Sequence, residues 1–213
     1  IIDPTTVNWQ FMKKYLWILA AAFLLQACSK DEEEGPYVPW RPGDDKEETI
    51  ELDKATRVMI LTEQAKNRIV MIDQPTGKIA WEWKASDSGL SAAEQAWFNL
   101  PDEAKPVYNR TCVLVTASGG GVALIRIADK KAMFYAKPGG NPHSAEVLPD
   151  GNIVVASSTG NLLSVYVYNG ADSYVSRPAF TMPVHSAHNV VWDRKRGCLW
   201  TATGAQLLKL TYN

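Results

Sequence analysis

An internal repeat is the feature that most constrains what this chain can fold into. The segment HSAEVLPD begins at His143, and a similar segment, HSAHNVVWD, begins at His185, an offset of 42 residues. A turn of small residues follows each of these segments: ASSTGNLL begins at Ala156 and TATGAQLL at Thr201. A third such turn, TASGGGVA, begins at Thr116, 40 residues before Ala156. A period of roughly 40–45 residues that carries about four strands is typical of a β-propeller blade.

Short apolar runs separated by turn residues support an all-β fold. The expected strands include Val58–Glu63, Arg68–Asp73, Lys78–Trp83, Ile153–Ser157 and Leu162–Tyr168. One helical insertion is expected to begin at the capping box formed by Ser91 and Glu94 and to end near Phe98. Helical solenoids share the period but need a helical periodicity that the sequence lacks. We therefore predict a β-propeller, with a β-sandwich or another all-β arrangement as the alternative.

The repeat predicts about four blades in residues 54–213. The four units begin near Arg57, Glu103, His143 and His185. Closed propellers mostly have six to eight blades, so we expect a partial, truncated propeller whose open arc leaves two unpaired ends. Cys112 and Cys198 fall on non-adjacent units and are expected to be buried and unpaired.

The N-terminal segment has the three parts of a secretory signal. Met12 is followed by Lys13 and Lys14, then by an apolar run over 16–25 that is too short to span a bilayer, and a small residue precedes Cys28. Residues 12–27 are therefore predicted to be a signal peptide, with residues 1–11 as upstream leader. A buried core helix is the alternative, but it leaves the lysine pair and the acidic stretch after Cys28 unexplained.

Residues 28–53 are expected to form a flexible acidic tether. They hold ten acidic and three basic residues, with several prolines and glycines, and such a segment cannot bury enough apolar surface to offset its ordering entropy. Residues 54–213 carry 17 basic and 12 acidic residues without a clustered basic stripe. Nucleic acid is therefore not expected as a partner.

Several motifs resemble known families. Leu25 to Cys28 resembles the lipobox of bacterial lipoproteins, which implies that residues 12–27 are a lipoprotein signal peptide and that Cys28 is the lipidation site. The acid cluster Asp31 to Glu34 resembles the surface-export signal of Bacteroidetes lipoproteins. The segment GKIAWEW at Gly77 resembles quinoprotein-like repeats, and the segment from His143 to Ile153 resembles blades of arylsulfotransferase-like propellers. Taken whole, the chain resembles an uncharacterised family of Bacteroidetes β-propeller surface lipoproteins. The resemblance implies a lipid anchor in the outer membrane at the cell surface, and it implies no activity.

The candidate site lies where the first strands of successive blades converge on the propeller axis. The repeat aligns His143 with His185, and the 40-residue offset adds Glu103. Glu146 and His188 stand three residues further along. Imidazoles and carboxylates that converge in this way can bind a divalent metal or act as acid and base. The alternative is structural: repeated His-Ser openings can satisfy backbone groups between blades.

The sequence leaves the function open between two classes. The first is a surface-anchored propeller that binds a glycan or a protein ligand, with Trp40 or Trp97 as a candidate sugar-stacking platform. The second is a propeller lyase or transferase that uses the axial histidines, with a divalent metal as its candidate cofactor. A redox quinoprotein is a weaker third hypothesis, suggested by Gly77 to Trp83 alone. Gly119 to Gly121 is expected to be a turn, since no Lys-Ser/Thr pair follows it.

Overall fold

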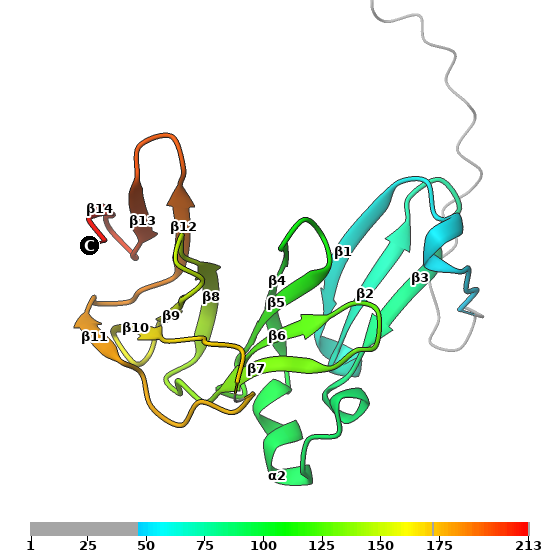
Figure 1. Cartoon of the computed structure of the whole chain (residues 1–213), viewed down its shortest axis with the longest axis horizontal. Helices are drawn as coiled ribbons and strands as arrows, with labels where there is room; N and C mark the ends of the chain where they lie inside the picture. Colours follow the sequence, from blue (N-terminus) through cyan, green and yellow to red (C-terminus); the bar gives the residue numbers. More distant parts are fainter. Residues whose placement is uncertain (1–46, 172, 213) are drawn as a thin grey trace, which may run out of the picture. The chain divides into compact units, whose positions relative to one another are not determined.

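Four antiparallel sheets follow one another along the chain in the computed structural model, which describes residues 47–171 and 173–212 (Figure 1). In each sheet the strands pair in the order in which they occur in the sequence. We refer to the sheets as blades 1 to 4. Blade 1 contains β1 (Val58–Glu63), β2 (Arg68–Asp73) and β3 (Lys78–Trp83); blade 2 contains β4 (Pro101–Val107), β5 (Cys112–Ala117), β6 (Val122–Arg126) and β7 (Ala132–Ala136). Blade 3 contains β8 (Pro142–Val147), β9 (Ile153–Ser157), β10 (Leu162–Tyr166) and β11 (Phe180–Pro183); blade 4 contains β12 (Asn189–Asp193), β13 (Cys198–Ala202) and β14 (Leu207–Leu210).

The hydrophobic core consists of three layers, one between each pair of neighbouring blades. Successive side chains of a strand point to opposite faces, so β5 packs Val113 and Val115 against blade 1 and Leu114 against blade 3. The layer between blades 3 and 4 contains Val154 and Val190. The first strands of the blades are neighbours in turn: β1 packs against β4, β4 against β8, and β8 against β12. Sheets stacked face to face with their first strands innermost have the blade arrangement that the repeat predicts.

The sequence located many of these elements correctly. The structure confirms the bounds of β1, β2, β3 and β9, and it ends β10 two residues earlier than expected. Helical turns connect β3 to β4: η3 (Ala85–Ser88), α2 (Ala92–Gln95) and η4 (Ala96–Phe98). Ser91 Oγ accepts a hydrogen bond from Glu94 N, and Glu94 Oε2 accepts one from Ser91 N at 2.8 Å. The predicted capping box therefore starts α2, and η3 precedes it as a turn that the sequence did not predict.

The predicted tether boundary at residue 53 is wrong, because residues from Glu47 on pack against blade 1. Ile50 N donates to Ile79 O at 3.0 Å and Ile79 N donates to Glu48 O at 2.9 Å, so this segment runs parallel to β3 along its outer edge. The turn η1 (Leu52–Lys54) then leads into β1, and η2 (Gln64–Lys66) joins β1 to β2. The segment that precedes the first blade thus pairs with the start of an edge that would otherwise be open.

Exposed apolar side chains mark the two ends of the arc. On β1, the side chain of Ile60 packs toward blade 2. Met59 and Leu61, on either side of it in the sequence, point the other way and are exposed. In blade 4, Val191 and Leu207 are 51% and 67% exposed. These are the faces that further blades cover in a closed propeller. Within the described residues, no helix is long and apolar enough to cross a membrane.

Both cysteines of the blades are buried and unpaired, as predicted. Cys112 begins β5 and Cys198 begins β13, so they occupy the second strands of blades 2 and 4. Cys28 lies outside the described residues.

Candidate functional site

Two of the inner strands carry a bulge at their opening residues. On β4 the register shifts between Pro101 and Glu103, and on β8 it shifts between Pro142 and Ser144. Asp102 and His143 are therefore the extra residues, outside the regular pairing. A bulge redirects the side chain that it carries. The same irregularity in adjacent blades thus brings a carboxylate and an imidazole close together.

His143 is the centre of this group. Its ring stacks on that of His188, with the ring centroids 4.7 Å apart and the ring planes at 12°. Nδ1 of His143 lies 3.8 Å from Asp102 Oδ1, and Nε2 lies 3.0 Å from Asn141 Nδ2. His188 lies at the end of the connection from blade 3 to blade 4. Its backbone N donates to Ala202 O on β13, and its ring is exposed. We refer to Asp102, Asn141, His143 and His188 as the axial site.

Asp102 is held firmly and is mostly buried. Ser118 Oγ lies 3.1 Å and 2.8 Å from its two carboxylate oxygens and donates to them, and Gln64 Nε2 donates to Oδ1 at 3.4 Å. Burial raises the pKa of Asp102, while the hydrogen bond from Ser118 and the nearby His143 act in the opposite direction. The carboxylate is thus oriented by its neighbours and faces an imidazole that it can orient in turn.

Glu103 and Glu146 belong to a second cluster, built around Lys105. Lys105 Nζ lies 3.2 Å from Glu103 Oε2 and 3.4 Å from Glu146 Oε2. The same ammonium group donates to Ala145 O at 2.9 Å and to Val190 O at 2.8 Å. Glu103 Oε2 also accepts a hydrogen bond from Ala145 N at 3.0 Å. Both carboxylates are therefore occupied in joining blades 2, 3 and 4.

The predicted equivalence of His143 and His185 is wrong. The strand register pairs Ser144 with Ala156 but Val190 with Thr201, so the two inner strands correspond at an offset of 46 residues, not 42. His185 instead lies in the connection before β12, where it is exposed and lines a separate pocket with Thr203 and Gln206. Blade 4 therefore begins at Asn189.

The predicted alignment of Glu103 with His143 is also wrong by one residue. Glu103 pairs with Thr116 as Ser144 pairs with Ala156, so the counterpart of His143 in blade 2 is Asp102. Among the described residues, no group of three or more His, Cys, Asp and Glu side chains is arranged to hold a metal ion. The predicted metal set of His143, His185 and Glu103 is thus not assembled in the described part of the chain.

The other candidate residues have structural surroundings. Trp97 is half-buried and packs near Tyr135 and Tyr174, with Lys137 Nζ 5.3 Å from its ring centroid, so it is not an exposed platform. Gly121 N donates to Trp97 O, and a Cβ at Gly119 would lie 2.5 Å from Ala96 O, so the glycine run is a tight turn against the helical insertion. Trp40 lies outside the described residues.

Comparisons with solved structures define the class of the fold. The chain is similar to the WD40 beta propeller domain of Doa1, with a TM-score of 0.53 and 13% identity over 76% of this chain and 48% of that one. It is similar to Kuenenia stuttgartiensis hydrazine synthase, with a TM-score of 0.52 and 16% identity over 80% of this chain and 48% of that one. The described residues are thus four blades of a β-propeller, and the chain spans about half the length of these two structures. At such identities the likeness shows the fold alone.

Sequence comparison places the chain in a family. Residues 12–212 match the model of a family of unknown function, DUF6528, and the chain belongs to that family. A comparison with curated proteins gave no match.

Proposed function

We propose that this chain is a lipid-anchored surface protein that binds a glycan at the axial site. The observation that carries the proposal is the stacked pair of His143 and His188 beside the oriented carboxylate of Asp102. Sugar hydroxyls both donate and accept hydrogen bonds, and this group offers imidazole nitrogens together with carboxylate oxygens. The exposed ring of His188 is a flat surface on which the C–H face of a sugar can stack.

The three histidines of the chain provide a matched test of the axial site. His143→Ala and His188→Ala are each expected to weaken glycan binding by about tenfold or more, because each removes a hydrogen-bonding group and half of the stacked pair. His185→Ala is the control, since His185 lines a different pocket. The measurement is calorimetry against a panel of defined neutral and acidic oligosaccharides. Binding that survives both axial changes, or that depends equally on His185, would contradict the proposal.

A second candidate is a propeller lyase or transferase, and the approach of Asp102 to His143 Nδ1 favours it. A carboxylate that orients an imidazole is the usual partner of a histidine that moves protons. The same oligosaccharides, incubated with the protein and analysed by mass spectrometry, distinguish the two functions. Cleaved, unsaturated or group-transferred products that disappear in His143→Ala would establish the enzyme, whereas unchanged saccharides leave the binding function.

The lipid anchor is proposed from the signal peptide and Cys28, and the location from the acidic cluster that resembles a surface-export signal. Cys28→Ser is expected to move the protein from the membrane fraction to the soluble fraction, because the thiol that carries the lipid is lost. Cys198→Ala is the control for a buried cysteine that has no part in anchoring. Fractionation after a carbonate wash, with labelling by a fatty-acid analogue, checks this. A Cys28→Ser protein that keeps its label and stays on the membrane would refute the assignment.

A further inference from the structure

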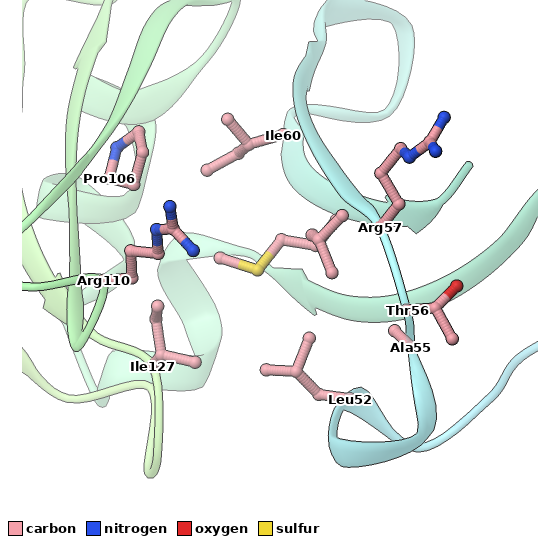
Figure 2. Close-up of a pocket in the computed structure, with 10 residues that line it drawn as sticks. Leu52, Ala55, Thr56, Arg57, Ile60, Pro106, Arg110 and Ile127 are labelled. Atoms are coloured by element: carbon pink, nitrogen blue, oxygen red, sulfur yellow. The ribbon is translucent and has the colours of Figure 1, made fainter. Parts of the chain in front are cut away.

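A cleft of about 690 Å³ lies between blades 1 and 2, and it shares no residue with the axial site. Figure 2 shows its lining. Ile60 and Met71 come from blade 1, Ile127 from blade 2, and Leu52 from the turn before β1. The volume falls in the range of about 300–1,000 Å³ that is usual for small-molecule sites. The interior of the cleft is therefore apolar and large enough for a ligand.

Two arginines flank this apolar interior. Arg57 and Arg110 both line the cleft, and Figure 2 shows them on opposite sides of it. Among the described residues, no carboxylate lies within ion-pair distance of either guanidinium, although Arg68, Arg126 and Arg196 all have such partners. Arg57 Nη1 donates to Gln74 Oε1 at 3.4 Å. The two cations are thus available to an anion from solution.

The backbone around both arginines is fixed. The buried carboxylate of Asp73 accepts hydrogen bonds from Thr56 N at 3.0 Å and from Arg57 N at 3.3 Å. Arg110 lies in the turn between β4 and β5, in which Tyr108, Asn109 and Arg110 all have positive φ angles, of 49°, 55° and 66°, and Thr111 N donates to Tyr108 O. Such a run is costly for residues other than glycine. The positions from which the two guanidinium groups extend are therefore set before any ligand binds.

We propose that this cleft binds an anionic amphiphile, a molecule with one carboxylate, sulfate or phosphate group on an apolar body. The apolar interior takes the body, because it removes that surface from water. Arg110 takes the head group with a planar fork of donors, which suits carboxylate and phosphate geometry. Arg57 adds the second positive charge at the other side of the cleft. A molecule with the same apolar body but a neutral or cationic head group lacks the ion pairs with the two arginines.

Calorimetry with dodecanoate, below its critical micelle concentration and on the full chain, tests the proposal. Arg110→Gln is expected to weaken binding by tenfold or more, and the double variant with Arg57→Gln to abolish it. Arg177→Gln is the matched control, since it removes one positive charge from an exposed loop residue that does not line the cleft. Ala55→Phe, which fills the cleft and keeps both arginines, is expected to abolish binding as well.

Three further probes define the outcomes that would overturn the proposal. Dodecyltrimethylammonium bound as tightly as dodecanoate would show that the arginines play no part. Sedimentation with phosphatidylglycerol vesicles that depends on Arg110, without binding of free dodecanoate, would reassign the arginines to a membrane surface. A peptide of residues 29–38 that binds in an Arg110-dependent way, again without dodecanoate binding, would reassign the cleft to the acidic stretch of the chain itself.

Discussion

Lys105→Met is expected to lower the free energy of unfolding by about 2–4 kcal/mol, because it leaves two carboxylates and two backbone carbonyls without their shared cation. Lys105 extends from β4 to contact Glu146 on β8 and Val190 O on β12, so one ammonium group joins the inner strands of three blades. Its side chain is 26% exposed, and screening by water is therefore partial. Urea denaturation measures the loss.

Two further variants separate the role of Lys105 from a general effect of charge. Lys209→Met removes an exposed lysine that has no ion pair among the described residues, and it is expected to change stability by less than about 0.5 kcal/mol. Adding Glu146→Gln to Lys105→Met is expected to restore part of the loss, since one unpaired carboxylate disappears. A Lys105→Met protein as stable as the wild type would show that the cluster contributes nothing to the joining of the blades.

The loss in Lys105→Met is also expected to depend on pH. Burial raises the pKa of Glu146 above its ordinary value of 4.5, and Lys105 opposes this rise. A carboxyl group whose pKa is higher in the folded state than in the unfolded state stabilises the fold at pH values below its ordinary pKa. This stabilisation is lost as the pH rises through the pKa of the folded state. Without Lys105 the folded pKa rises further, so the destabilisation should grow from pH 4.5 toward neutral pH. An equal loss at both ends of this range would contradict the explanation.

Phe134→Ala is expected to lower the free energy of unfolding by about 3–5 kcal/mol. Phe134 is fully buried between blades 2 and 3, and its ring lies 5.8 Å from that of Tyr166 and 5.9 Å from that of Tyr168. Removing the ring leaves a cavity that two strands fixed in their sheets cannot close. Phe180→Ala is the matched control, because Phe180 is 60% exposed on β11 and its loss should be nearly neutral. Thermal and urea unfolding of both variants make the comparison, and equal effects would contradict the placement of the core.

Local sequence patterns sufficed to predict the blades. The strands from Val58 to Trp83 alternate with tight turns, so their bounds follow from turn chemistry and from residues that favour strands. The start of α2 follows from the capping box at Ser91, whose hydrogen bonds are local. The tether boundary was missed because the pairing of Glu48 and Ile50 with Ile79 is a long-range contact, and an acidic composition does not reveal it.

The axial site was only partly predictable because hairpin length varies from blade to blade. Glu103 precedes its partner Thr116 by 13 residues, Ser144 precedes Ala156 by 12, and Val190 precedes Thr201 by 11. A fixed repeat offset therefore cannot align both strands of a hairpin. Asp102 could have been found by allowing for one extra residue near the start of the first strand of each blade. Lys105 and Asn141 carried no repeat signal, and only the packing of blades 2, 3 and 4 reveals the contacts of Lys105.

The segment that precedes blade 1 also determines how the protein would respond to mechanical load. A pull on the chain ahead of Glu47 reaches the propeller first through two backbone hydrogen bonds to Ile79 and through the ion pairs Glu47–Arg68 and Glu48–Lys78. This segment runs parallel to β3 at Ile79, and its contact with the core layer between blades 1 and 2 is the partly buried side chain of Leu52. It would detach at lower force than any strand inside a blade and release a few residues of slack. Tension would thus be relieved before it reached the interfaces between the blades.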